Sequence, residues 1–266
     1  MTTERVFGFD LRSSPQEDVR QYLPFLKYLE YQTRYRFRLR FTPKDSDIIE
    51  DLGKGIMHFS AIGATSFIHA NQHHDVIPLV RGKNTHNQAN YRSYLVVRPN
   101  STVSKLSQIC GKRMVFGNQT STQGHLIPRI ILQQNNIPLS DFQSYDYTGF
   151  HLSCANTVVS NRADVCGMQD TMAEEMSRNG LLKILYRSKL YPSSGISAHA
   201  KVSTQIIRQI QYALLQFDPN DKHKSSLYNW HKTEMPNGFV RTSEADYADL
   251  KSWMLKLGFL KNTAER

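Results

Sequence analysis

Residues 116–124, Phe-Gly-Asn-Gln-Thr-Ser-Thr-Gln-Gly, place three hydroxyl groups where an apolar run gives way to a helical pattern. The first N–H groups of a helix have no acceptor within it, and the positive end of the helix dipole lies there, so anions are stabilised at helix starts. The hydroxyls of Thr120, Ser121 and Thr122 can donate to different oxygens of one tetrahedral group. The stretch therefore indicates either an oxyanion site or an ordinary helix start capped by Ser or Thr.

A histidine cluster and a His–Cys pair could also carry chemistry. His69, His73 and His74 have helical spacing, but no nearby Glu or Cys completes a zinc site, so we expect a solvated helix end and no metal. His151 and Cys154 lie one helical turn apart, yet no orienting group or oxyanion hole accompanies them. We therefore expect no catalytic dyad, no cofactor and no enzyme.

The three cysteines, Cys110, Cys154 and Cys166, are too few and too scattered for a disulfide framework or a zinc cage. Cys166 lies in an apolar run, which favours a small buried core residue. No segment approaches the ~20 apolar residues of a membrane span. The N-terminus also lacks the pattern of a signal peptide, so either a leader has been removed or the protein is cytoplasmic.

Short apolar runs alternate with helical patterns along the chain, as is typical of an α/β fold. Residues 34–41 alternate strictly between basic and apolar side chains, which predicts an outer strand with a solvated arginine face rather than a nucleic-acid-binding strand. The pattern predicts further strands at residues 6–9, 57–62, 76–80, 91–98, 114–117, 142–147, 163–168, 181–186 and 191–198. Helices are expected around residues 19–29, 48–52, 120–134, 151–161, 170–179 and 206–215.

Two long extended segments, residues 91–98 and 191–198, bracket about a hundred residues of complete α/β structure. This arrangement predicts a second lobe inserted into the first and joined to it by two hinge strands. We place lobe I at residues 1–93 and 195–266 and lobe II at residues 94–194, each a mixed sheet flanked by helices, with a ligand cleft between them. The excess of 33 Lys and Arg over 23 Asp and Glu favours anionic partners without identifying them.

Residues 121–128, Ser-Thr-Gln-Gly-His-Leu-Ile-Pro, resemble the Ser-Thr-Ser-Gly-x-Leu-x-Pro signature of periplasmic phosphonate- and phosphite-binding proteins of ABC transporters. Other matches to this family follow in the same order: residues 91–97 to its first crossover strand, 111–113 to a turn before a strand, 149–151 to its Gly-x-His helix start and 161–165 to its Gly-x-Ala-Asp-Val turn. Asn161 replaces the glycine of that last motif. The resemblance covers residues 7–217 and implies a two-lobed class II periplasmic-binding-protein fold.

The resemblance also implies a set of ligand contacts. Thr120, Ser121 and Thr122 would hold the oxyanion, and the remaining contacts expected by position are Thr65, Ser66, Tyr91, Ser93, His151, Gln169 and Asp170. His151 is equally compatible with a helix-capping or surface role, and Tyr91 with a packed aromatic side chain of a strand. Asp170 is also compatible with a plain N-cap. Gln169 and Ser194 stand where relatives that take aminophosphonates place acidic residues, which favours phosphite, methylphosphonate or phosphate.

The function that this resemblance implies is capture of a small phosphorus oxyanion in the periplasm and delivery to an ABC transporter permease, with no role for nucleic acid. Two alternatives stay open at this level. The lobes could form the sensor of a membrane signalling receptor or act with one, or the fold could carry an enzyme of the thiamine-pyrimidine synthase type. The chain shows no recognisable catalytic set for the enzyme.

Overall fold

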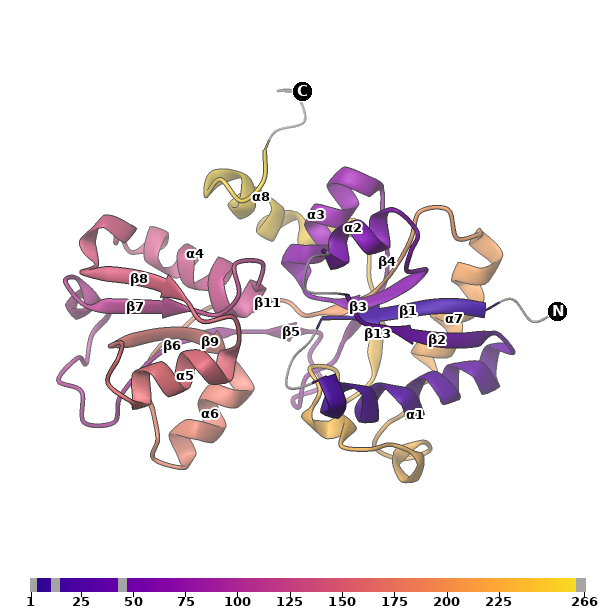
Figure 1. Ribbon diagram of the computed structural model, residues 1–266, viewed down its shortest axis with the longest axis horizontal. Helices are drawn as coiled ribbons and strands as arrows, with labels where there is room; N and C mark the ends of the chain where they lie inside the picture. Colours follow the sequence, from indigo (N-terminus) through magenta and orange to yellow (C-terminus); the bar gives the residue numbers. More distant parts are fainter. Residues whose placement is uncertain (1–3, 11–14, 43–46, 262–266) are drawn as a thin grey trace. The chain divides into compact units, whose positions relative to one another are not determined.

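The computed structural model describes residues 4–10, 15–42 and 47–261, and these form two compact units. One unit comprises residues 1–90 and 192–251, and the other residues 91–191 and 252–266 (Figure 1). Residues 252–261 thus group with the second unit, although lobe I was expected to contain them. The reason is packing: the Phe259 ring lies 4.8 Å from the ring of His125. No helix in the described residues is long and apolar enough to cross a membrane.

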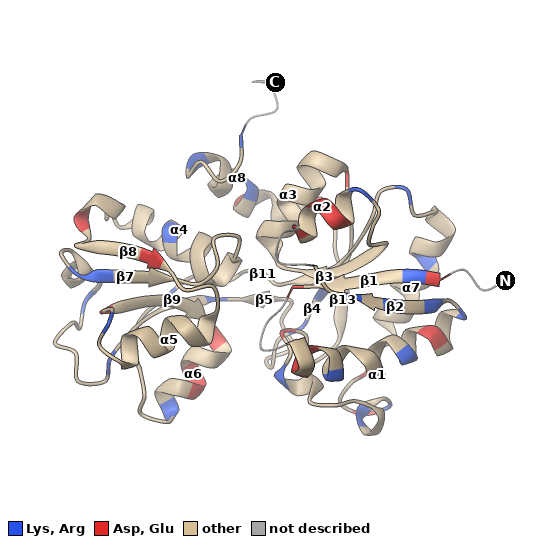
Figure 2. Cartoon of the chain, viewed as in Figure 1, with Lys and Arg blue, Asp and Glu red and all other residues tan. Residues whose placement is uncertain are grey.

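The positive charge is divided unequally between these units. The first holds 19 Lys and Arg against 16 Asp and Glu, and the second 14 against 7, so the formal charges are +3 and +7. Figure 2 marks these residues along the chain, with basic side chains at the start of β7 in the second unit. The smaller unit therefore carries most of the net charge of +10.

The first unit is built on a six-stranded sheet of order β13-β4-β12-β3-β1-β2. The strands are β1 (Glu4–Phe9), β2 (Arg36–Arg40), β3 (Phe59–Ile62), β4 (Ile77–Gly82), β12 (Gly195–Ala198) and β13 (Phe239–Arg241). The helices are α1 (Pro15–Thr33), α2 (Ile48–Gly53), α3 (Ala64–His74) and α7 (Thr204–Leu215), with the short turns η4 (Lys224–Ser226), η5 (Trp230–Lys232) and η6 (Glu244–Tyr247). Helix α8 (Ala248–Lys256) begins in this unit and ends in the second. In α1, the apolar residues Tyr22, Leu26 and Leu29 lie on the buried face at three- and four-residue spacing, as the pattern predicted, whereas Leu23 is exposed.

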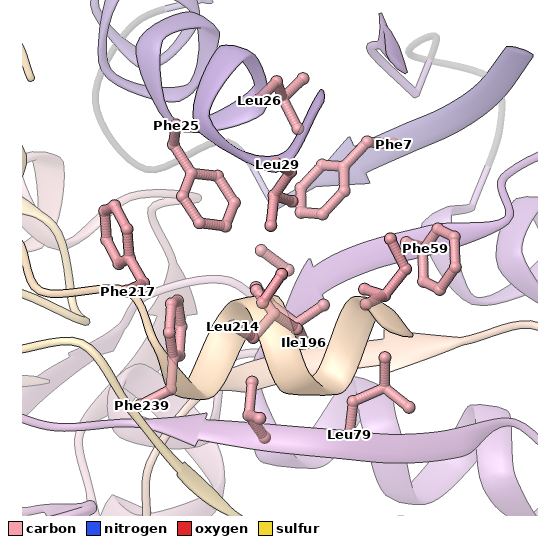
Figure 3. Close-up of a cluster of buried hydrophobic side chains, with 14 of the residues drawn as sticks. Phe7, Phe25, Leu26, Leu29, Phe59, Leu79, Ile196, Leu214, Phe217 and Phe239 are labelled. Atoms are coloured by element: carbon pink, nitrogen blue, oxygen red, sulfur yellow. The ribbon is translucent and has the colours of Figure 1, made fainter. Parts of the chain in front are cut away.

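A hydrophobic core of this unit lies between the sheet and helices α1 and α7 (Figure 3). Phe25 of α1 is fully buried and packs edge-on against Phe217 at 5.1 Å between ring centroids. Edge strand β2 turns Phe37 and Leu39 toward this core, while Arg36 and Arg38 are exposed. The interpretation of residues 34–41 as an outer strand is confirmed, because the aromatic and basic side chains occupy opposite faces.

The second unit is built on a five-stranded sheet of order β10-β6-β9-β7-β8. Its strands are β6 (Ser93–Val97), β7 (Arg113–Phe116), β8 (Ser144–Tyr147), β9 (Val165–Gln169) and β10 (Lys183–Arg187). β7, β8 and β9 run parallel to one another. β6 is antiparallel to β9, and the edge strand β10 is antiparallel to β6. Its helices are α4 (Ile127–Gln134), α5 (His151–Val159) and α6 (Asp170–Arg178), with η1 (Leu106–Ile109), the π-helix η2 (Thr122–Leu126) and η3 (Leu139–Asp141).

Each expected connecting strand is interrupted in the structure. Residues 91–98 divide into β5 (Asn90–Tyr91) and β6, and residues 191–198 into β11 (Tyr191–Pro192) and β12. The first break falls at Arg92, whose backbone N–H donates to the carboxylate of Asp170 (2.8 Å) and so leaves the strand ladder. β5 and β11 pair with each other as a separate two-stranded sheet.

A disulfide joins Cys154 of α5 to Cys166 of β9, which corrects the expectation that Cys166 is a plain core residue. The two cysteines are 12 residues apart, and both are fully buried where α5 packs on the sheet. Sequence spacing did not indicate the bond, because the packing of a helix on a neighbouring strand brings the two Cα atoms to 5.9 Å. Cys110 is free and exposed.

Candidate functional site

The Ser121 turn, residues 117–124, follows the carboxyl end of β7 and begins η2. Its base is a contact between two glycines: the Gly117 N–H donates to the Gly124 carbonyl at 2.9 Å. A Cβ on Gly117 would lie 3.3 Å from the Gly124 Cα, and one on Gly124 would lie 3.0 Å from the His151 ring. Small residues are therefore required at both positions. The two glycines of residues 116–124 were visible in the sequence, but their contact was not.

Ser121 is the N-cap of η2, and its side-chain oxygen accepts from the Gly124 N–H at 2.9 Å. Ser121 therefore has the ordinary capping role, but that role uses only a lone pair of its hydroxyl oxygen and not its proton. Within the part of the chain that the structure describes, no acceptor takes the Ser121 hydroxyl proton, and the side chain is partly exposed. Pro128 lies at the start of α4, where its missing N–H is tolerated, so the helix divides into η2 and α4.

Gln123, which was not among the predicted contacts, fixes the turn from the protein side. Its side-chain amide donates to the Arg92 carbonyl (2.7 Å) and to the Asp170 carboxylate (3.1 Å). Its own carbonyl accepts from the Ser93 hydroxyl at 2.6 Å. Since Gln123 and Ser93 are both buried, these bonds are shielded from water and hold the Gln123 side chain and the Gln123–Gly124 peptide in one orientation.

Asp170 was expected as a ligand contact, and in the structure its carboxylate has three protein donors. These are the backbone N–H groups of Arg92 (2.8 Å) and Thr171 (2.9 Å) and the Gln123 amide. Burial raises the pKa of the Asp170 carboxyl, with the three hydrogen bonds acting in the opposite direction. Ser93 has a comparable supporting position, because its hydroxyl donates to the Gln123 and Met168 carbonyls.

Replacing Asp170 with Asn should test this supporting role. One carboxylate oxygen becomes an amide NH2 that faces a donor, so a buried donor is left without an acceptor at a cost of about 1–3 kcal/mol. We expect a lower free energy of unfolding by that amount in urea denaturation. Thr171→Ala, which keeps the backbone N–H to Asp170, is the control and should change stability little. Equal stability of the Asp170→Asn variant and the parent protein would contradict the role.

The other predicted residues of the second unit are distributed around the turn. His151 is the first residue of α5. Its ring lies against Gly124, and its Nδ1 accepts from the Gln169 N–H at 3.4 Å. The Thr120 N–H and hydroxyl both donate to the Asn118 side chain, at 2.9 and 3.0 Å. Thr122 is buried at the first position of η2, and Tyr91 is buried in β5. The structure therefore gathers Ser121, Thr122, His151 and Gln169, while Ser93 and Asp170 support them.

A second residue that sequence reasoning missed is His125, which is buried in η2. Its Nδ1 lies 2.8 Å from the Gln119 carbonyl, and its Nε2 lies 3.1 Å from the Tyr147 hydroxyl. A carbonyl can only accept, so Nδ1 carries the proton and Nε2 accepts from Tyr147. Burial lowers the pKa of His125 from 6.5 to about 4. The neutral ring thereby fixes the residues that precede Ser121.

In the first unit, Thr65 and Ser66 lie in the first turn of α3 and are buried. Gly63 is the N-cap of this helix without a side-chain cap, and its N–H donates to the Asp10 carboxylate at 3.1 Å. At the end of the same helix, His74 contacts Glu50 at 3.0 Å. In the described residues, no group of three His, Cys, Asp or Glu side chains could hold a metal ion.

An acidic residue that position in sequence did not indicate is Glu234, whose carboxylate accepts from the Ser194 hydroxyl. The preference expected for phosphite, methylphosphonate or phosphate rested on the residue types at positions 169 and 194. The fold brings a carboxylate to Ser194 from 40 positions along the chain. The lack of an acidic residue at 194 therefore no longer disfavours an amine-bearing ligand.

Comparison with known proteins gives one family and one fold. The family described as "ABC transporter, phosphonate, periplasmic substrate-binding protein" matches residues 7–247, thirty residues beyond the resemblance noted in the sequence. The solved structure of PhnD1 from Prochlorococcus marinus, in complex with methylphosphonate, is similar with a TM-score of 0.83 at 16% identity, covering 97% of this chain and 99% of that one.

Two other solved structures have the same fold. A binding component of an ABC phosphonate transporter from Pseudomonas aeruginosa has a TM-score of 0.81 at 18% identity, covering 96% of this chain and 87% of that chain. The alkanesulfonate-binding protein of Xanthomonas axonopodis pv. citri, bound to MOPS, has a TM-score of 0.65 at 14% identity, covering 96% of this chain and 92% of that chain. The expected two-lobed periplasmic-binding-protein fold is confirmed.

Proposed function

Because the chain belongs to the family of periplasmic phosphonate-binding components of ABC transporters, we propose that it captures a phosphonate, phosphite or phosphate ion at the Ser121 turn. The observation that carries this proposal is that the residue which fixes the turn and the residue which can donate to a ligand are different. Ser93, Arg92 and Asp170 fix Gln123, whereas the Ser121 hydroxyl keeps a proton to donate. A donor that is already held in place loses little conformational entropy when the ligand binds.

The chemistry of the turn suits a tetrahedral oxyanion. The Ser121 hydroxyl is a neutral donor, and an anion receives a charge-assisted hydrogen bond from it at the positive end of the helix dipole. His151 adds a ring next to Gly124. We also propose that Thr65, Ser66 and Gln169 contact the ligand, as the family resemblance implied, and that the protein acts in the periplasm with a permease partner.

Removing the two hydroxyls of the turn should weaken binding. We expect the Ser121→Ala/Thr122→Ala variant to bind its ligand ten- to a hundredfold more weakly, since two hydrogen bonds to a charged group are lost. Isothermal titration with methylphosphonate, phosphite, phosphate and aminoethylphosphonate measures this and identifies the ligand. Loss of the Ser121 cap lowers stability by only about 1 kcal/mol, so the variant should remain folded.

The matched control is Ser107→Ala/Ser160→Ala, which removes two exposed hydroxyls from the same unit. Its affinity should equal that of the parent protein. An unchanged affinity in the Ser121→Ala/Thr122→Ala variant would overturn the site, and no binding of any of the four ions would overturn the ligand class. Recovery of the bound ion unchanged, followed by 31P NMR, separates a receptor from an enzyme.

A further inference from the structure

A polar cavity of about 320 Å³ lies at the end of the second unit's sheet where β6 ends and β7 and β9 begin, and the proposed transport function does not use it. Its walls come from the loop after β6, the turn before β7 and the turn before β9. The lining residues are Arg98, Asn100, Ser101, Thr102, Val103, Lys112, Asn161 and Asp164. Lys112 is five residue steps along β7 from Gly117, roughly 16 Å at about 3.3 Å per residue. The cavity is therefore distinct from the Ser121 turn.

The cavity contains one carboxylate, and its charge is already matched. Asp164 accepts from the Arg113 backbone N–H, Nε and Nη2, all at 3.0 Å, and lies 3.5 Å from the Arg98 guanidinium. These bonds hold the pKa of the Asp164 carboxyl at about 2, so it stays ionised. Arg98, Arg113 and Lys112 carry three positive charges against this one negative charge. Lys183, whose ammonium donates to the carbonyl of the lining residue Ser101 (2.9 Å), adds a fourth, so the local excess is three positive charges.

Several hydrogen-bond donors in the cavity are uncommitted. Arg98 donates through Nη1 to the Val158 (3.4 Å) and Ala163 (3.0 Å) carbonyls and through Nη2 to Asp164, which leaves two of its five N–H groups. In the described part of the chain, the Lys112 ammonium has no hydrogen-bond or ion-pair partner. Asn161 contributes its side-chain NH2, because only its oxygen is bonded to Arg113 (3.4 Å).

We propose that this cavity binds the dianionic phosphate of a phosphomonoester, with Arg98 and Lys112 as its charged contacts. A phosphomonoester carries close to two negative charges at neutral pH, which the positive excess attracts, and its three acceptor oxygens can accept from the uncommitted donors of Arg98, Lys112 and Asn161. The volume lies at the lower end of the range for ligand pockets and suits a small compound. Arg98 is positioned by two carbonyls and Asp164, so the site exists before the ligand arrives.

Lys112 offers a clean test, because its side chain makes no contact on which the fold depends. We expect glycerol 3-phosphate to produce saturable 1H–15N NMR shifts at Asn100, Thr102, Lys112 and Asn161, with glycerol producing none. Lys112→Gln should weaken this binding about tenfold, the loss of one charge-assisted hydrogen bond. Local amide signals keep this site separate from binding at Ser121.

The matched control is Arg162→Gln, which makes the same charge change at an exposed residue of the turn before β9 that does not line the cavity. Its affinity should stay within about twofold of the parent protein, since exposed charges are screened by salt. Equal weakening by both variants, or no saturable shift at the four amides, would overturn the proposal. Co-sedimentation with phosphatidylcholine vesicles containing phosphatidic acid, lost in Lys112→Gln, would assign the phosphate to a lipid headgroup rather than a soluble ester.

Discussion

Acidification from pH 7 to pH 4 should lower the free energy of unfolding by about 3 kcal/mol through His125 alone, since each unit of pKa shift is worth about 1.4 kcal/mol. The pKa of His125 is about 4 in the folded protein, and 6.5 is its ordinary value. Between these values the unfolded state binds the proton and the folded state does not. The stabilisation is therefore fully present above pH 6.5 and is lost as the pH falls toward 4. Urea denaturation at pH 7, 6, 5 and 4.5 measures the slope.

His125→Phe separates this contribution from other groups that titrate in the same range, including His58 and His69, whose pKa values burial also lowers. The phenyl ring keeps the packing against Phe116 (5.0 Å) and Phe259 (4.8 Å) but cannot bind a proton. The variant should be less stable at pH 7, because the Gln119 carbonyl and the Tyr147 hydroxyl lose their partner. Its stability should fall less between pH 6.5 and 4.5 than that of the parent protein. Parallel curves for the two proteins would show that His125 is not the group responsible.

Reduction of the Cys154–Cys166 disulfide should also cost about 3 kcal/mol, the loop-closure entropy returned to the unfolded chain by opening a loop of this length. Both cysteines are fully buried, and as thiols they remain small apolar side chains that fill the same space. The helix α5 would stay in place but be less strongly held to β9. The midpoint of urea denaturation with and without dithiothreitol measures the effect.

Two variants make the reduction experiment specific. Cys154→Ala/Cys166→Ala should have a low midpoint that dithiothreitol does not change further, whereas Cys110→Ser should respond to the reductant like the parent protein. A midpoint of the parent protein that is insensitive to reductant would mean that the bond adds nothing to stability. Because α5 also carries His151 next to Gly124, ligand affinity in the reduced protein reports whether the bond helps to position that ring.

Much of the architecture could be predicted from local patterns, because each lobe consists of short strands and helices whose buried faces have the periods of two and 3.6 residues. The alternation in residues 34–41 placed Phe37 and Leu39 on the core face of β2, as the structure has them. The breaks at Arg92 and after Pro192 were not predictable in this way. At Arg92 the backbone N–H bonds to a side chain 78 residues away, and no local pattern reports that contact.

In the candidate site, too, local features could be predicted from the sequence and contacts between distant residues could not. The amino-acid sequence by itself determined where a helix starts beside three hydroxyls and that the chain resembles phosphonate-binding proteins, because these features are local or ordered along the chain. Only the tertiary structure decided that Asp170 and Ser93 support Gln123, that Cys154 bonds to Cys166 and that Glu234 reaches Ser194. These groups are far apart in sequence and are joined by packing between elements. A hydrogen bond or disulfide of that kind depends on three-dimensional distance, which residue types and spacing do not specify.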